Sequence, residues 1–132
     1  LEGVELNIDK IEVPQTHKTI VVEGAGGIMV PLNSRETYLD LMLKLNLPVV
    51  LVTRHYLGSI NHTMLSWKVL KETGLNVVAL VISGKAHETT ESHFATQMDV
   101  PFIRINELVE LNPETIATEA ERLKSNIKGL IV

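Results

Sequence analysis

Several features are scarce in this chain, and each scarcity excludes a class of protein. It has no cysteine, so neither a disulfide framework nor a cysteine zinc site can stabilise it. Its longest apolar runs, residues 47–52 and 77–82, have six residues each, far fewer than the ~20 that span a bilayer. Aromatic residues make up only 4%, and Lys and Arg form no cluster, which excludes the surfaces that bind nucleic acids.

The composition is that of a globular domain. The chain has 132 residues, of which 45% are hydrophobic, and 12 Lys and Arg against 16 Asp and Glu give a formal charge of −4. One domain with its own core is expected at this length. The sequence begins with Leu1 rather than Met, so we expect that it was cut or begins inside a longer reading frame. With no signal or transit peptide in the sequence, we expect a cytoplasmic protein.

The hydrophobic pattern alternates between two periods. Short β-branched runs predict buried strands, and stripes at helical spacing predict helices between them. This order is typical of an open parallel α/β sheet with flanking helices, in which ligands bind at the carboxyl ends of the strands. The expected strands are residues 19–23, 47–53, 75–83 and, more weakly, 101–105; the expected helices are residues 36–46, 59–73, 88–98 and 113–126; residues 1–18 form a loosely organised lead-in, whose apolar pieces could be a strand or a helix end.

Some of these elements carry finer predictions. The runs at 47–53 and 75–83 are apolar at almost every position, which suits strands covered on both faces. The helix at 59–73 is expected to bury Ile60, Met64, Trp67 and Leu70 between Gly58 and Gly74. Asn112 is the expected N-cap of the last helix, with Pro113 in its first turn and the charge of Glu114 near the helix dipole.

The first candidate site is Glu23 with the glycines that follow it. A carboxylate at the end of an apolar strand is costly unless it meets a cation, and magnesium with phosphate is a natural partner. Gly24 to Gly27 would let backbone N–H groups approach a ligand closely. The alternative is that Glu23 is simply the first solvated residue after the strand. The loop matches neither the dinucleotide fingerprint nor a P-loop.

The second candidate site is the turn from residue 54 to residue 63, which leads into a helix. Ser59 or Asn61 could cap this helix, and a helix start of this kind can bind an anion. An ordinary capped helix is the alternative. The five histidines show no metal-ligand spacing, so we interpret them as surface or cap residues.

In this order and spacing, several segments closely resemble the dethiobiotin synthetase family, ATP-dependent enzymes of biotin synthesis. The segments are Val22–Leu32, Leu47–Val52, Leu57–Thr63, Gly74–Ile82 and Leu111–Glu114. The resemblance covers about the carboxyl half of that family. It implies that residues 1–132 are the carboxyl-terminal part of a single P-loop-NTPase-like domain, a Rossmann-like three-layer fold lacking its amino-terminal half. The P-loop and the catalytic Lys would lie in the missing half, so this chain holds no catalytic residue and alone is expected to be inactive.

The resemblance also implies a reaction. Carbon dioxide adds to an amine of 7,8-diaminononanoate, ATP phosphorylates the carbamate, and the second amine closes the ureido ring. ATP and Mg²⁺ are the implied cofactors, and the enzyme is expected to be a homodimer that binds no nucleic acid or membrane. By resemblance, Glu23 would bind the metal; Glu23, Gly24, Ala25, Gly26, Ser83, Gly84, Asn106, Glu107, Leu108 and Glu114 would bind the nucleotide; and Gly26, Leu57, Gly58, Ser59, Ile60 and Asn61 would bind the substrate, the last five holding its carboxylate across the dimer interface.

The chain departs from the family where adenine binds. The family places an Asn-Asp pair where this chain has Ser83-Gly84, and a proline-containing loop at positions 106–108. A serine hydroxyl cannot offer a purine the paired donor and acceptor of an amide. The departure puts adenine selectivity in question and keeps a second hypothesis open, a non-catalytic dethiobiotin-synthetase-like sensory or assembly domain of a larger protein.

Overall fold

The computed structural model describes residues 6–128 and divides the chain into two compact units, one ending at Leu47 and the other starting at Pro48. Of the lead-in at residues 1–18, the first five residues lie outside the described part.

The first unit contains a short 3-10 helix, η1 (Ile8–Lys10), and the helix α1 (Tyr38–Leu45). A small cluster of Ile8, Leu32 and Leu41 holds them together, and Lys44 donates to the backbone carbonyls of Ile8 and Ile11. The helix predicted at residues 36–46 is therefore confirmed. The lead-in, for which the sequence allows a strand or a helix end, contributes a helical turn.

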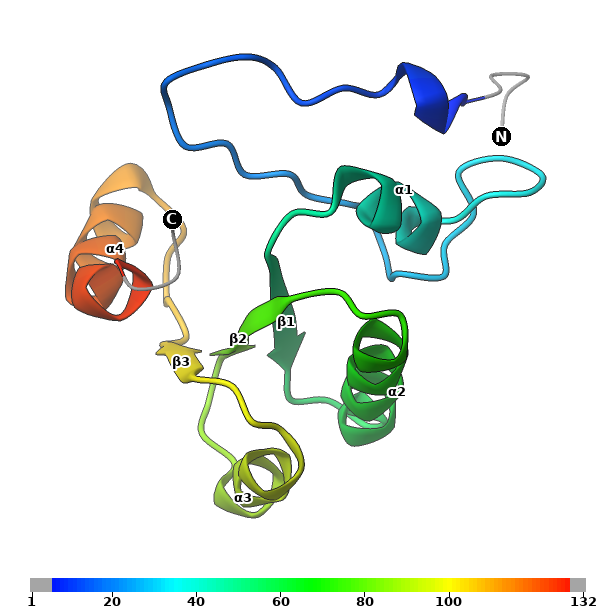
Figure 1. The fold of residues 1–132 in the computed structure, drawn as a ribbon. Helices are drawn as coiled ribbons and strands as arrows, with labels where there is room; N and C mark the ends of the chain where they lie inside the picture. The colour runs from blue at the N-terminus through cyan, green and yellow to red at the C-terminus, as the bar shows by residue number, and fades with distance from the viewer. Residues whose placement is uncertain (1–5, 129–132) are drawn as a thin grey trace. The chain divides into compact units, whose positions relative to one another are not determined.

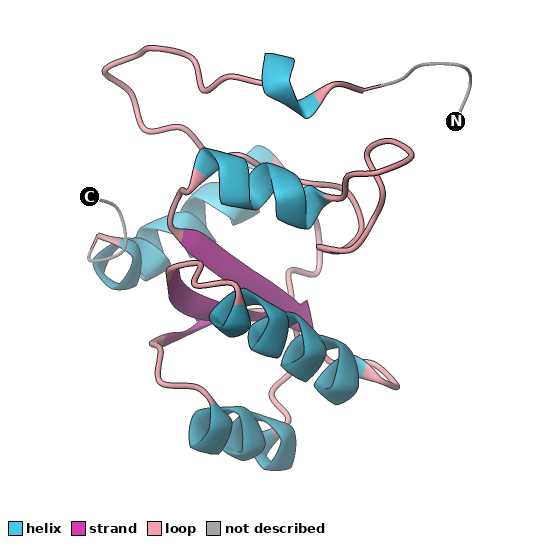
Figure 2. Cartoon of the chain, turned by 45° about the vertical axis from the view of Figure 1, so that its right-hand side comes forward, coloured by secondary structure: helices cyan, strands magenta, loops and turns pink. Residues whose placement is uncertain are grey.

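The predicted strand at residues 19–23 is wrong: the structure shows irregular backbone there, and Figure 2 draws this stretch as loop. The side chain of Val21 is 87% exposed and that of Val22 is 52% exposed. A strand needs a neighbour to accept its backbone hydrogen bonds, and no described strand pairs with this segment. The apolar pattern of residues 19–23 is that of a strand, but the segment has no ladder to join.

The second unit contains a parallel sheet of three described strands: β1 (Val49–Arg54), β2 (Val77–Ser83) and β3 (Phe102–Ile105). Their order is β1-β2-β3. Because β2 lies between two partners, five of its seven residues are buried. The three strands end together, since Ser83 is paired with both Arg54 and Ile105. The carboxyl ends of all three strands therefore form one edge.

Three helices accompany this sheet (Figure 1): α2 (Ser59–Glu72), α3 (Glu88–Gln97) and α4 (Pro113–Ile127). Leu123 of α4 packs with Ala79, Val81 and Ile103, which by strand alternation share one face of the sheet. Helix α2 contacts β1, where the hydroxyls of Thr53 and Thr63 are 2.7 Å apart. The order of elements and the parallel sheet agree with the predicted α/β class.

Two predictions about burial need correction. In β1, burial alternates, and the side chains of Val50 and Val52 are 44% and 63% exposed. Val50 and Val52 are paired with Ala79 and Val81, so they lie on the face of the sheet on which α4 packs. Leu123 of α4 covers that face over β2 and β3, and β1 lies beyond it. In α2, Ile60 is exposed while Ser59 and Thr63 are buried. Trp67 and Leu70 are buried as predicted, so the buried face differs from the prediction only in the first half of the helix, where Thr63 meets the Thr53 hydroxyl.

Other local predictions are confirmed. Asn112 caps α4 by accepting a hydrogen bond from the Thr115 N–H at 3.0 Å, and Pro113 lies in the first turn. His87 caps α3 by accepting from the Thr90 N–H at 3.3 Å. Within residues 6–128, none of the helices is both long and apolar enough to pass through a bilayer.

Candidate functional site

The loop after residue 22 lies in the first unit and presents Glu23 on its surface. Glu23 and residues 24–27 are exposed. Gly24 lies against Tyr38, since a Cβ at Gly24 would be 2.9 Å from Tyr38 Cδ1, and Gly26 has a φ of +84°. Both positions therefore require glycine, the first for close approach and the second for its backbone conformation.

The end of this loop covers the beginning of α1. The N–H groups of Tyr38 and Leu39 donate to the carbonyls of Val30 and Ile28, at 3.1 and 2.8 Å. Two of the amides that a helix start leaves without partners are thus satisfied by the chain itself. These two amides are therefore not free to bind an anion at the start of α1.

The surroundings of Glu23 fit a metal ion that takes most of its ligands from phosphate oxygens and water and few from the protein. In the described part of the chain, no three His, Asp or Glu side chains gather closely enough to hold a metal ion by themselves. Mg²⁺ commonly uses one or two carboxylates together with phosphate oxygens and water. A single exposed carboxylate beside glycines, as at Glu23, is compatible with that donor set.

The second predicted site, at the start of α2, lies in the second unit. Gly58, not Ser59 or Asn61, is the N-cap, with a φ of +96°, and no side chain of the described residues caps the helix. Ser59 is buried, while Leu57, Ile60 and Asn61 are exposed. The Ser59 N–H donates to the Tyr56 carbonyl at 3.0 Å, whereas the described hydrogen bonds leave the N–H groups of Ile60 and Asn61 open to an anion. The capping prediction is wrong because a glycine takes that position.

Next to this helix start, Tyr56 and His62 form a hydrogen-bonded pair. The Tyr56 hydroxyl is 2.9 Å from His62 Nδ1, and the ring centres are 5.7 Å apart. A Cβ on Gly58 would lie 3.5 Å from the His62 ring. The pair is polar and near the start of α2, where a carboxylate would meet both a donor ring and backbone amides.

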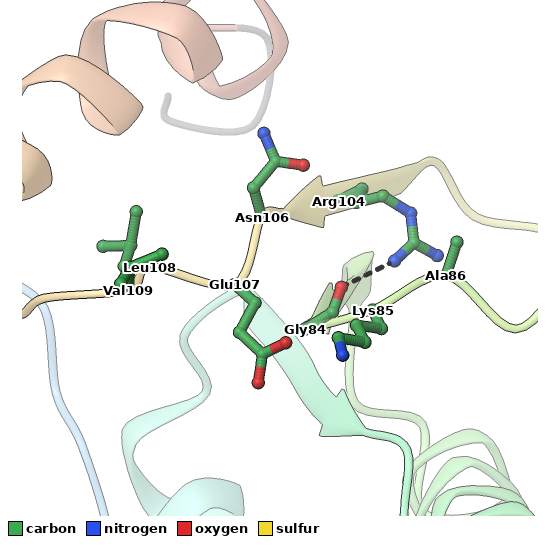
Figure 3. Close-up of a pocket in the computed structure, with 8 residues that line it drawn as sticks. All are labelled: Gly84, Lys85, Ala86, Arg104, Asn106, Glu107, Leu108 and Val109. Carbon is green, nitrogen blue, oxygen red and sulfur yellow. Dashed lines mark hydrogen bonds between the residues drawn. The ribbon is translucent and has the colours of Figure 1, made fainter.

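A pocket of about 640 Å³ opens at the carboxyl edge of the sheet (Figure 3). It lies between the segment after β2 and the segment after β3. Ligands of parallel α/β sheets bind at this edge. The pocket is lined by Gly84, Lys85, Ala86, Arg104, Asn106, Glu107, Leu108 and Val109.

Four residues expected at the nucleotide come together in this pocket: Gly84, Asn106, Glu107 and Leu108. Two others, Ser83 and Glu114, are not among its lining residues; Ser83 is the last residue of β2 and Glu114 lies in the first turn of α4. The Asn106 amide is directed toward α4, where its Nδ2 is 3.5 Å from Glu119 Oε2 (Figure 3). Asn106 therefore offers the pocket mainly its backbone.

Glu119 of α4 holds the wall that follows β3. Its Oε1 accepts the Asn106 N–H at 2.7 Å, and Arg122 donates to both of its oxygens at 2.8 and 2.6 Å. The Arg122 guanidinium and the Asn106 N–H lower the pKa of Glu119 to about 2. The carboxylate is therefore charged at neutral pH and fixes the first residue of this wall.

Glu91 of α3 holds the other wall. Its carboxylate forms an ion pair with Arg104, lies 3.0 Å from His55 Nε2 and accepts the His87 N–H at 2.7 Å. Burial alone would raise the pKa of Glu91, but the His87 N–H, Arg104 and His55 together lower it to about 2. Three parts of the unit meet at this one carboxylate: His55, which directly follows β1, Arg104 of β3, and α3 itself.

The sequence pattern does not single out Glu91, Arg104 or Lys85, and it indicates His55 only as a surface or cap residue. Arg104 carries a usable signal, because a charge in the middle of a four-residue apolar strand needs a partner. His55 follows the last residue of β1 and so lies at the ligand-binding edge. The partner, Glu91, is 36 positions from His55, and nothing in its polar helix distinguishes it from Glu88.

Comparison with known proteins agrees with this geometry. The family described as AAA domain matches residues 1–124. The chain belongs to this family. An open parallel sheet with helices is the core of such P-loop-NTPase-like domains, so the predicted fold class is confirmed.

The chain is also similar to dethiobiotin synthetases. It is 41% identical over 128 residues to the ATP-dependent dethiobiotin synthetase BioD of Christiangramia forsetii, covering 96% of this chain and 61% of that protein. The BioD proteins of Rhodopseudomonas palustris and Lawsonia intracellularis are 43% and 44% identical over 91 and 88 residues, covering 69% and 67% of this chain and 44% and 43% of theirs. The predicted resemblance is thus confirmed. The chain spans about half the length of the curated relatives that it matches.

Proposed function

We propose that the protein containing this chain is an ATP-dependent ligase that forms the ureido ring of dethiobiotin from 7,8-diaminononanoate and carbon dioxide. The observation that carries the proposal is the pocket at the carboxyl edge of the sheet. Four of the residues that line it are those that the resemblance assigns to the nucleotide. Relatives named ATP-dependent dethiobiotin synthetase support the same reaction.

The nucleotide base is proposed to lie between Gly84 and Leu108. These residues follow two neighbouring strands, so their backbones flank the same space. Leu108 and Val109 offer an apolar surface for a planar ring, and the carboxylate of Glu107 can accept a hydrogen bond from an exocyclic amine. Ser83 replaces the family amide, so backbone groups are proposed to take its place in recognising the base.

The phosphates and the metal are assigned to Glu23 and the glycines Gly24 to Gly26. Glu23 would hold Mg²⁺, which supplies positive charge against the phosphates of the nucleotide when bound. The glycines bring backbone N–H groups close to anionic oxygens without side chains in the way. This assignment rests on the donor set and on the resemblance.

The substrate carboxylate is assigned to the start of α2. The N–H groups of Ile60 and Asn61 have no partner among the described hydrogen bonds, no side chain caps the helix, and Asn61 is exposed. The helix dipole favours a negative charge at this position. In the proposal this helix start serves the partner subunit of a cytoplasmic homodimer, as the resemblance implies.

Two variants of the complete gene product test the assignment, with dethiobiotin and ADP measured together. Glu23→Gln should abolish magnesium-dependent turnover and leave the fold intact, while Glu12→Gln, another carboxylate of the first unit, serves as the matched control. Undiminished turnover by Glu23→Gln would refute the metal assignment.

Asn61→Ala should raise the KM for 7,8-diaminononanoate about tenfold, because it removes a contact to the carboxylate and not to the reacting amines. The KM for ATP should stay within about twofold. A selective loss of ATP binding would contradict this assignment. A wild-type protein that binds ATP but forms no dethiobiotin would favour the non-catalytic sensory or assembly domain instead.

A further inference from the structure

One ion pair holds both ends of the loop that connects β2 to α3. The loop runs from Gly84 to His87. At its first residue, Arg104 Nη1 donates to the Gly84 carbonyl at 3.1 Å. At its last residue, the His87 N–H donates to Glu91 Oε1 at 2.7 Å. Because Arg104 and Glu91 are themselves paired, the two tethers form one continuous structure.

The first tether acts on a residue whose backbone is unusual. Gly84 has a φ of +97°, a conformation that side chains rarely adopt. Its N–H donates to the Ile105 carbonyl at 3.1 Å, and its own carbonyl accepts from Arg104. Both peptide groups of Gly84 are thus held by β3. Figure 3 shows the Arg104 guanidinium directed at this carbonyl, beside Lys85 and Ala86.

The position of this ion pair matters more than its contribution to stability. The side chains of Arg104 and Glu91 are only 29% and 22% exposed. Removing such charges from water costs about as much as their attraction returns, so a buried pair is weak evidence for stability. What it does supply is position, because one arm of the Arg104 guanidinium donates to the Gly84 carbonyl while the other forms the ion pair with Glu91.

We propose that Arg104 and Glu91 are positioning residues, which set nucleotide affinity by holding the Gly84–Ala86 wall of the pocket in its binding conformation. The inference rests on the proposed function of this pocket. Lys85 and Ala86 lie between the two tethers. Among the described residues, neither side chain forms a hydrogen bond, so this part of the wall is held at its two ends. Without the tethers, a ligand would have to order this wall on binding, and affinity would fall.

His55 completes the arrangement from the other side. Its Nε2 lies 3.0 Å from the same Glu91 oxygen that accepts the His87 N–H, and its ring centre is 5.6 Å from that of His87. Glu91 is therefore fixed by β1 and by the loop as well as by Arg104. This predicts that the carboxylate keeps its place when Arg104 alone is shortened.

The test uses the complete gene product and the double variant Glu91→Gln with Arg104→Met. It removes both charges together, so neither is left unpaired, and the amide introduced in place of the Glu91 carboxylate keeps an oxygen for the His87 N–H. The matched control is Glu72→Gln with Lys68→Met, which makes the same change in an exposed ion pair of α2. Arg104→Lys is a second, milder variant, because one ammonium group cannot reach Gly84 and Glu91 as the two guanidinium arms do.

Two quantities are measured in each variant: the hydrogen-exchange rates of the Gly84 and His87 amides, which are hydrogen-bonded at the two ends of the loop, and the Kd for ATP. In the double variant we expect exchange to be about tenfold faster and the Kd for ATP to rise about tenfold, with the Kd for 7,8-diaminononanoate within about twofold. Arg104→Lys should lie between wild type and the double variant, and the α2 control should match wild type.

A folded double variant with wild-type exchange and wild-type ATP affinity would overturn the positioning role and leave the proposed function standing. If the double variant does not fold, Arg104→Lys decides by the same two readings. A wild-type protein that binds no ATP would instead overturn the proposed function. Exchange at the Gly84 and His87 amides that stays as slow in the double variant as in wild type would overturn the tethering of the loop, whatever the protein binds.

Discussion

At the scale of single residues, carboxylates organise the carboxyl edge of the sheet. Glu91 and Glu119 each accept a backbone N–H from a wall of the pocket and each pair with an arginine. Neither could be identified from the sequence, because each lies on a polar helix among other acidic residues. Only the fold shows which carboxylates are used, because it brings Glu91 to His55, 36 positions away, and Glu119 to Asn106, 13 positions away.

The low pKa of Glu91 predicts a pH dependence of stability. Its folded-state pKa is about 2 against an ordinary value of 4.5. The stabilisation is therefore fully present above about pH 4.5 and is lost as the pH falls toward 2. Urea unfolding of the complete gene product at several pH values in this window should show a shallower loss of stability for Glu91→Gln than for wild type. Equal slopes for the two proteins would contradict the network around Glu91.

At the scale of elements, the three strands of the sheet and the helices α1 to α4 were predictable, whereas the irregular backbone of residues 19–23 and the buried residues at the start of α2 were not. The apolar run of β2 identifies a strand buried on both faces because it lies between β1 and β3. Residues 19–23 carry the same pattern but are irregular, since a strand depends on a neighbour that its own sequence does not contain. Likewise, the buried face of α2 depends on the Thr53 hydroxyl across from it.

The cap of α4 gives a prediction at this scale. Asn112→Ala removes the acceptor of the Thr115 N–H and should lower the free energy of unfolding by about 1 kcal/mol. Asn126→Ala, at an exposed position of the same helix, is the control and should change it by less than about 0.5 kcal/mol. Urea unfolding of the three proteins measures both changes. If the two variants are equally stable, the cap does not stabilise α4 as described.

At the scale of the whole molecule, the second unit has apolar surface that its described residues do not cover. Val50 and Val52 of β1 are exposed on the same face of the sheet that α4 covers over β2. An apolar strand of this kind at the end of a sheet is usually covered by further structure or by another chain. The fold class could therefore be predicted from the sequence, but what covers β1 could not.

The proposed homodimer gives a prediction at this scale. Leu57 is fully exposed beside the start of α2, the region that the proposal places at the dimer interface. Leu57→Asp in the complete gene product should shift the protein from dimer to monomer at micromolar concentration, because a charge would have to be buried. Leu111→Asp, also at an exposed leucine, should leave the dimer intact. Sedimentation gives the masses, and a dimer unaffected by Leu57→Asp would place the interface elsewhere.

The most direct test of the account is the product of the reaction itself. The complete gene product is incubated with 7,8-diaminononanoate, ATP, Mg²⁺ and isotopically labelled bicarbonate, and the product is analysed by mass spectrometry. The account predicts dethiobiotin with the label in its ureido carbon, formed together with ADP and only when ATP is present. ATP binding or hydrolysis without any labelled dethiobiotin would contradict it.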